Sequence, residues 1–244
     1  MKRLYIIVWG VFCTLHTFAQ FHFDINVTNN HLWRGIEVAD GLVVTSDVSY
    51  TLLKGHVNVG VWGGTNTTGR YKEFNYHASF QAKGFSLALW DTYNFSPDAT
   101  YNNKEFFNYK ASETGRFLDT TVAYRFGGKF PLYVSWSAII AGRDRNEANT
   151  ANKYSSFCYV EYPVYRMRGW TMEVGAGGAF ALNRAGSSGH FYGNKPGIVH
   201  VSARLSRSIL LGDYTFPVYA CAVWNPQADR AYLQVGVRLF SLDE

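Results

Sequence analysis

Residues 230–239 read Arg-Ala-Tyr-Leu-Gln-Val-Gly-Val-Arg-Leu, so that polar and apolar side chains alternate. One set of alternate positions is wholly apolar: Ala231, Leu233, Val235, Val237 and Leu239. The intervening positions carry Arg230, Tyr232, Gln234, Gly236 and Arg238. Successive side chains of a β-strand point to opposite faces. This period of two therefore predicts a strand with one apolar and one polar face.

The same alternation recurs along the chain. In the segment 199–205, for example, Val199 shares the apolar face with Val201, Ala203 and Leu205. Such segments predict about twelve strands, at 21–34, 42–53, 56–64, 71–82, 85–95, 115–126, 131–141, 153–166, 170–182, 197–209, 214–225 and 229–240. Most reach the roughly nine to eleven residues with which a tilted strand crosses a bilayer. The stretch 96–114, with Phe106, Phe107 and Tyr109, leaves ten or fourteen strands as alternatives.

The predicted connections alternate between two kinds. Short turns are expected at 54–55, 83–84, 127–130, 167–169 and 210–213, and loops, mostly longer, at 35–41, 65–70, 96–114, 142–152, 183–196 and 226–228. Short turns at one rim and longer loops at the other are typical of bacterial outer-membrane barrels. One residue fits poorly: Asp91 shares a face with Leu87 and Leu89, which places it at a rim or beside a bulge.

Composition and the first residues indicate export. Charged residues make up only 17% of the chain, and aromatic residues another 17%. Without the first twenty residues, which include Lys2 and Arg3, the chain carries 21 basic and 18 acidic side chains, and this net charge of +3 is too mild to predict nucleic-acid binding. Lys2 and Arg3 precede an apolar run, and Thr17-Phe18-Ala19-Gln20 resembles a cleavage site, so residues 1–20 are expected to be a signal peptide. Residues 21–244 would then form the barrel domain.

A transmembrane barrel turns its apolar face to lipid and its polar face to the interior. A soluble sandwich shows the same alternation, but large aromatics near strand ends favour the membrane because they form interfacial belts. The aromatics in question are Tyr71, Tyr93, Tyr124, Phe126, Trp170 and Trp224.

The polar faces predict which side chains line the interior. They are Asp24, Asp47, Glu73, His77, Asp119, Arg125, Glu161, Glu173, His200, Arg204, Arg230 and Arg238. Acids dominate the early strands, and bases gather on the last three. Two interpretations stay open: a pore with a transverse field that orients charged solutes, or a plugged interior whose charges pair.

Enzymatic and metal-binding patterns are missing from the sequence. It has no His-Glu-x-x-His, no Gly-x-Ser-x-Gly and no cysteine-rich metal spacing. We therefore expect no catalytic residues, no metal and no cofactor.

A family resemblance comes from the first strands. Trp33-Arg34-Gly35-Ile36, and then Trp62-Gly63 within Val59-Gly60-Val61-Trp62-Gly63-Gly64, resemble motifs of TorF-family porins over roughly residues 23–95. The resemblance implies an outer-membrane protein with a transport role, and it supplies no substrate. From the residues themselves, Gly35 is expected to adopt a positive φ, with Trp33 at the membrane interface and Arg34 reaching the headgroups or the rim.

Together these patterns predict an up-and-down transmembrane β-barrel of about twelve strands in the Gram-negative outer membrane. The predicted function is passive diffusion of small solutes through a porin-like channel. Expected partners are outer-membrane lipid, small solutes or ions and the barrel-assembly machinery, with no nucleic acid and a monomeric state. The alternatives are a soluble periplasmic β-protein that binds a lipid or sugar, and a structural or lipid-modifying barrel.

Overall fold

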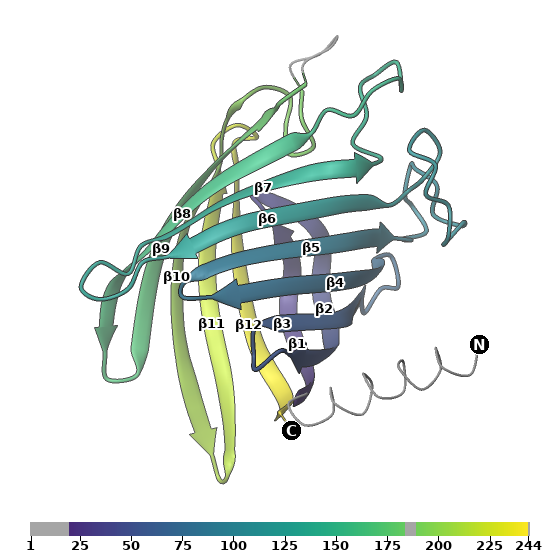
Figure 1. The fold of residues 1–244 in the computed structure, drawn as a ribbon. Helices are drawn as coiled ribbons and strands as arrows, with labels where there is room; N and C mark the ends of the chain where they lie inside the picture. The colour runs from purple at the N-terminus through teal and green to yellow at the C-terminus, as the bar shows by residue number, and fades with distance from the viewer. Residues whose placement is uncertain (1–19, 184–188, 244) are drawn as a thin grey trace, which may run out of the picture.

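The computed structural model describes residues 20–183 and 189–243, which form a closed antiparallel barrel of twelve strands (Figure 1). Each strand pairs with its neighbours in chain order, and β1 closes the sheet by pairing with β12. The strands are β1 (Gln20–Trp33), β2 (Ile36–Leu52), β3 (Val57–Asn66), β4 (Lys72–Ala82), β5 (Phe85–Asn94), β6 (Phe117–Arg125), β7 (Tyr133–Gly142), β8 (Ser155–Met167), β9 (Trp170–Ala181), β10 (Gly197–Leu211), β11 (Tyr214–Asn225) and β12 (Arg230–Asp243).

The predicted all-β barrel and its strand number are confirmed. Within the described ranges no helix is long and apolar enough to span a membrane. The predicted signal peptide lies outside the described residues, apart from Gln20 at the start of β1.

The alternation of the sequence becomes the two faces of the wall. Leu233, Val235 and Leu239 on β12 are each about half exposed on the outside, whereas Gly236 between them is buried. Exposed aliphatic and aromatic side chains recur around the outside of the wall, among them Val59, Leu87, Leu89 and Leu205. The polar positions of the same strands face inward, so the sheet encloses a polar interior.

The two ends of the barrel differ in their connections. One end, the short-turn end, carries the turns 53–56, 83–84, 126–132, 168–169 and 212–213. The other, the long-loop end, carries the loops 67–71, 95–116 and 143–154 and the described parts, 182–183 and 189–196, of the connection between β9 and β10. The predicted loop 35–41 was wrong, because β2 already begins at Ile36 and the connection is the two-residue turn Arg34-Gly35. Both turn residues have positive φ, 49° and 84°, as a tight hairpin turn requires.

Bulges shift some faces from their predicted sides. The register of β9 and β10 slips between Ile198 and His200, so Val199 is displaced from the apolar outer face. Val199 is instead fully buried with Phe117, Ile139 and Phe157. Strict alternation could not predict this, because a bulge inserts a residue without any signal in the hydrophobic pattern.

The loop 95–116 adds no strand to the barrel: its first part, with Tyr101, lines the interior, and its later part, with Phe106, lies against the outer face of the neighbouring strands. The ring of Phe106 packs against those of Phe74 and Tyr93, with centroids 5.8 and 5.3 Å apart. Beneath it the guanidinium of Arg116 bonds both oxygens of Asp91 at 2.8 and 2.9 Å. The outward Asp91 of β5 is therefore neutralised by a buried arginine from the loop.

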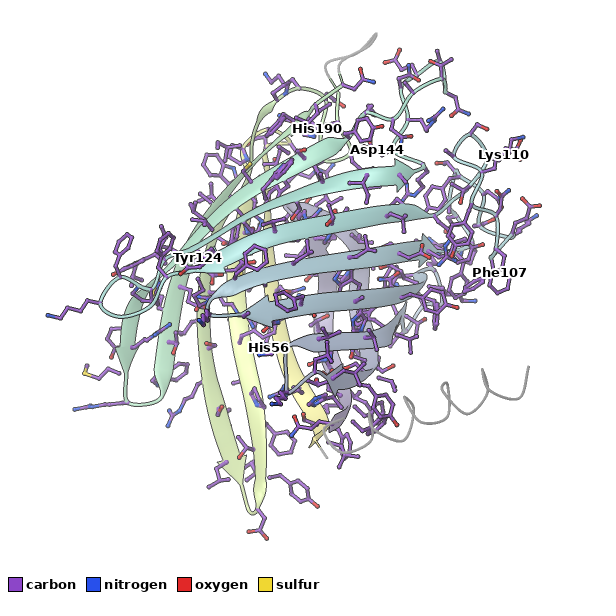
Figure 2. The ribbon with its side chains drawn as sticks, viewed as in Figure 1. His56, Phe107, Lys110, Tyr124, Asp144 and His190 are labelled. Atoms are coloured by element: carbon purple, nitrogen blue, oxygen red, sulfur yellow. The ribbon has the colours of Figure 1, made fainter. Side chains whose placement is uncertain are left out.

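Two members of the predicted aromatic belt do not face the surroundings. Tyr71 is buried against the ring of His31, and Tyr93 is covered by the loop 95–116. The remaining four, Tyr124, Phe126, Trp170 and Trp224, are exposed near strand ends. The loop contributes another exposed ring, because Phe107 is 78% exposed and points away from the barrel (Figure 2).

Candidate functional site

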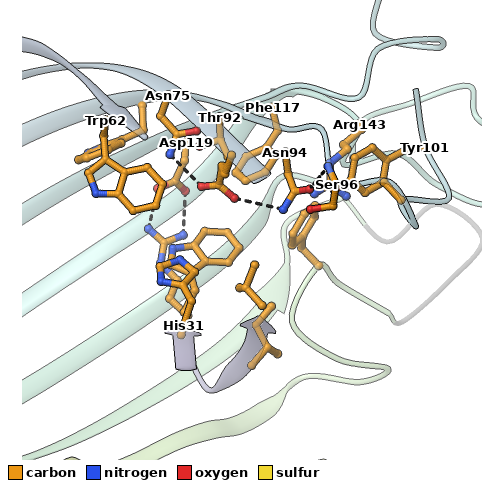
Figure 3. A pocket seen from close by; sticks show the side chains of 18 of the residues that line it. His31, Trp62, Asn75, Thr92, Asn94, Ser96, Tyr101, Phe117, Asp119 and Arg143 are labelled. Atoms are coloured by element: carbon orange, nitrogen blue, oxygen red, sulfur yellow. Dashed lines mark hydrogen bonds and ion pairs between the residues drawn. The ribbon is translucent and has the colours of Figure 1, made fainter. Parts of the chain in front are cut away.

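The turn between β1 and β2 reaches across the interior of the barrel. Nη1 and Nη2 of Arg34 donate to the two carboxylate oxygens of Asp119 on β6, at 2.8 and 2.6 Å, in a bidentate ion pair (Figure 3). Nη1 also donates to the hydroxyl of Tyr192 at 2.5 Å, and Nη2 to that of Thr121 at 3.3 Å. The strands β2 to β5 separate β1 from β6 along the sheet. The pair therefore ties two distant parts of the wall together.

Aromatic side chains surround this ion pair. The ring of Trp33 lies 5.6 Å from that of Phe117 and 5.2 Å from that of Tyr192, and the Arg34 guanidinium lies 4.8 Å from the centroid of the Trp33 ring. Burial raises the pKa of the Tyr192 phenol above its usual value, although Arg34 opposes the shift, so the phenol stays neutral. A buried ion pair needs such hydrogen bonds because desolvation of its charges is costly.

Close backbone contacts hold the turn in place. Nδ2 of Asn225, at the end of β11, donates to the carbonyl oxygen of Gly35 at 3.0 Å. A Cβ at Gly35 would lie 1.9 Å from the carbonyl oxygen of Val199, so only glycine fits at this approach. The positive φ predicted for Gly35 is confirmed, and the close packing against β10 is a second reason for glycine.

The predicted positions of Trp33 and Arg34 were wrong. Trp33 packs inside the barrel against the rings of Phe117 and Phe191, and Arg34 bonds Asp119 in the interior. Neither side chain lies at a membrane interface. The register of β1 against β2 shifts between Thr28 and Asn30 and again between His31 and Leu32. Bulges bend a strand and redirect its side chains. The bulges in β1 therefore account for the inward direction of Trp33 and Arg34.

A cavity of about 550 Å³ lies beside the turn, toward the long-loop end. Trp33, Arg34 and Asp119 line it together with residues from four other strands and four loops. Trp62 of the second motif also lines it, and Trp62 packs over Gly64, where a Cβ would lie 2.7 Å from the indole ring. The two sequence motifs, which are 29 residues apart at their tryptophans, thus meet at one cavity.

The predicted interior residue Glu73 is part of this cavity. Its two carboxylate oxygens accept hydrogen bonds from Nδ2 of Asn75 at 2.8 Å and Nδ2 of Asn94 at 3.3 Å. Figure 3 draws these hydrogen bonds as dashed lines from Asn75 and Asn94. Both amides are buried, so Glu73 is held in one orientation toward the cavity.

A second cavity, of about 340 Å³, opens at the short-turn end and contains Asp24, Asp47 and Arg238 from the predicted set. His77 lies between the two cavities. Its Nε2 is 2.8 Å from Oδ2 of Asp47, which lines the second cavity, and its ring stacks at 4.6 Å on Trp90, which lines the first. Asp47, His77 and Trp90 therefore lie between the two cavities, on the part of the wall formed by β2 to β5.

The other predicted interior residues form smaller groups. Arg125 and Glu161 lie 3.4 Å apart on β6 and β8, and Arg125 is about half exposed. Glu173 and Arg204 are directly opposite on β9 and β10, and the Arg204 guanidinium lies 4.1 Å from the ring centroid of Tyr219. His200 packs edge-on against Phe157 and Tyr159. Arg230 is exposed at the start of β12, next to the long-loop end.

Three functional candidates escaped the sequence analysis: Arg34 as an interior residue, Tyr192, and Arg143. Arg143 follows directly after β7 and lines the larger cavity, with its guanidinium 3.8 Å from the ring centroid of Tyr101. Burial lowers its pKa from the usual arginine value, and an arginine still stays protonated. Arg143 and Tyr192 lie in loops, where no strand periodicity indicates a side chain's direction.

In the described part of the chain no cluster of His, Cys, Asp and Glu could hold a metal ion.

Comparison with known proteins yields distant likenesses only. The COG4313 outer membrane channel from Pseudomonas putida F1 is 10% identical over 93% of this chain and 94% of that chain, with a TM-score of 0.39. OccAB3 of Acinetobacter baumannii is 11% identical over 92% of this chain and 64% of that chain, with a TM-score of 0.38. No family model matches the chain, and no curated protein does. Likenesses this distant carry no argument about function, and membership of the TorF family stays a prediction.

Proposed function

We propose that this protein is an outer-membrane channel for the passive diffusion of small polar solutes, with a passage narrowed by the turn between β1 and β2. The supporting observation is a closed barrel whose outside is apolar and whose polar interior holds a cavity toward each end. Closure of the sheet leaves no strand with an unpaired edge, as crossing a bilayer requires. Lipid would contact the exposed rows of Val, Leu and aromatic side chains.

The orientation follows from the two ends. In barrels of this kind the short turns face the periplasm and the longer loops face outward. The cavity beside Arg34 would then receive solutes from outside, and the cavity with Asp24 and Arg238 would open to the periplasm. The resemblance of Trp33-Arg34-Gly35 and Trp62-Gly63 to TorF-family motifs agrees with this role. Trp33, Arg34 and Trp62 line the cavity at the narrowed part of the interior, and Gly35 belongs to the turn that narrows it.

A closed, structural barrel is the second candidate. Its support is the Arg34–Asp119 pair, which crosses the interior, together with the contacts of His77 with Asp47 and Trp90 between the two cavities. The same contacts that narrow a channel would block it if no gap remains. Neither candidate requires a catalytic residue.

Planar-bilayer recording of the refolded full-length protein separates the two. A channel gives discrete conductance steps, and the steps should become larger in Arg34→Ala, which removes the side chain that crosses the interior. Heat-modifiable migration on a gel establishes that the protein added is folded. Folded protein that gives no steps, in the wild type and in Arg34→Ala alike, would rule out the channel and leave the closed barrel.

A further inference from the structure

Arg143 differs from the other buried arginines of the barrel. Its guanidinium lies among three rings, 3.8 Å from the centroid of Tyr101, 4.7 Å from that of Phe191 and 5.1 Å from that of Phe117. Figure 3 shows it beside Tyr101 at the edge of the larger cavity. Within residues 20–183 and 189–243 its Nε is buried and has no hydrogen-bond partner. Arg34 and Arg116, by contrast, are each bonded directly to an aspartate.

The acidic groups near Arg143 are already engaged by other donors. Asp144, the next residue, accepts from the backbone N–H of Ser155 at 2.7 Å and from the Ser155 hydroxyl at 2.8 Å. Glu73 accepts from Asn75 and Asn94 on its two oxygens. A buried cation without a bonded anion is energetically unfavourable. Because Arg143 also lines the cavity, its guanidinium can meet an anion there, although Nε itself is enclosed by protein.

The rest of the cavity has the character of a site for a small ring compound. Its volume of about 550 Å³ falls in the range of small-molecule pockets, roughly 300–1,000 Å³. Three indoles, those of Trp33, Trp62 and Trp90, contribute to its lining, and the polar side chains among them include Thr92 and Asn94. Aromatic side chains pack well against flat ring faces, and the hydroxyl and amide groups can bond ring substituents.

We propose that this cavity binds a small organic anion, a carboxylate carried on a ring, with the carboxylate on Arg143 and the ring among the indoles. A guanidinium presents parallel N–H donors that match the two oxygens of a carboxylate. Binding itself does not depend on conduction, and only its role as a recognition step for a passing solute rests on the proposed channel function. The site would select anions at the outer entrance of the barrel.

Isothermal titration of the refolded full-length protein in detergent tests this proposal. The probes are two matched pairs: glucuronate against glucose, and benzoate against benzamide. In at least one pair the anion should bind about tenfold more tightly than its neutral partner, as expected when a charge-assisted hydrogen bond is added. Which pair responds shows whether the ring is hydroxylated or aromatic.

Two variants locate the binding. Arg143→Gln should abolish the preference for the anion, whereas Arg166→Gln, which removes an exposed arginine near the short-turn end, should leave it unchanged. Equal binding of both members of each pair, or no binding of any probe, overturns the proposal. If Arg143→Gln does not fold, the binding of each anion and of its neutral partner to the wild-type protein still tests the proposal. Anion-selective binding without bilayer currents would support this site and refute the channel, so the two failures are distinguishable.

Discussion

Arg34 and Asp119 form a bidentate ion pair across the interior of the barrel, with N–O distances of 2.8 and 2.6 Å, although four strands separate β1 from β6 along the sheet. The exposed fractions of the two side chains are only 12% and 6%. The pair therefore acts as a brace that fixes the β1–β2 turn against the opposite wall. Its removal should affect the stability of the fold as well as the width of the interior.

Asp119→Asn keeps the shape of the side chain and removes its charge. We expect a loss of about 3–5 kcal/mol in the free energy of unfolding, because Arg34 is left as a buried charge without a counter-ion. Glu161→Gln is the control, since its partner Arg125 is 46% exposed and 3.4 Å away, and such exposed pairs contribute about 0–1 kcal/mol. Urea titration in vesicles, followed by tryptophan fluorescence, measures both. Similar losses for the two variants would show that the Arg34–Asp119 pair is not a brace.

Gly35→Ala tests the close approach of the turn to β10. Both Gly35 and Gly41 have positive φ, 84° and 79°, but a Cβ at Gly41 has nothing within 4 Å. Gly41→Ala should therefore cost only the conformational penalty of about 1–2 kcal/mol. Gly35→Ala should cost about 1–3 kcal/mol more, because the added carbon collides with the Val199 carbonyl. Equal unfolding free energies for the two variants would contradict the packing described for the turn.

The strands were predictable from the sequence because a strand that separates two environments must alternate. Each predicted strand overlaps an observed one, and β9, predicted at 170–182, ends at Ala181. The direction of Arg34 was not predictable in this way. It depends on two bulges in β1 and on a partner 85 positions away in the chain.

The candidate site was predictable only in part, for a related reason. Glu73 and Asp119 line the larger cavity, and alternation placed both on the polar face of their strands. Arg143 and Tyr192 belong to loops, where neighbouring residues have no fixed phase relative to the wall. Asp91 did carry a signal, since an acid on an apolar face requires a partner, but the sequence did not indicate that Arg116 from the loop 95–116 supplies it.

That partner can be tested with a double-mutant cycle. Arg116→Met should cost about 3–5 kcal/mol, because it leaves Asp91 as an unpaired charge beneath the loop. Adding Asp91→Leu should recover most of that loss, since an apolar pair suits the outer face opposite Tyr76. Chemical unfolding of the two single variants and the double variant gives the coupling energy. A double variant whose loss equals the sum of the two single losses would show that the two residues act independently.

The outer face should tolerate charge far less than the interior. Val235 on β12 is 49% exposed on the outside, and Val235→Arg should cost about 2–4 kcal/mol if it lies near the bilayer midplane. Ser79→Arg is the control, because Ser79 lines the cavity at the short-turn end beside Asp24 and Asp47. Gln234 is less suitable as a control, since it bonds the carbonyl of Asn30 and the hydroxyl of Tyr219. Equal folding yields of Val235→Arg and Ser79→Arg in vesicles would argue against a lipid-facing exterior.

The last prediction concerns ion selectivity. In the wild type the charges of Arg34 and Asp119 offset each other at the narrowed part of the interior. Arg34→Ala removes the cation and leaves Asp119 facing the passage, where a nearby charge is screened less than in bulk water. The variant should conduct more current. In a salt gradient its reversal potential should shift toward the equilibrium potential of the cation. The shift should shrink when Asp119→Asn is added, because no charge of the pair then remains.

Arg204→Gln is the control, because Arg204 does not line the larger cavity, and it should change the reversal potential less than Arg34→Ala does. A variant of Arg34 with unaltered conductance and unaltered reversal potential would place the ion path elsewhere in the barrel.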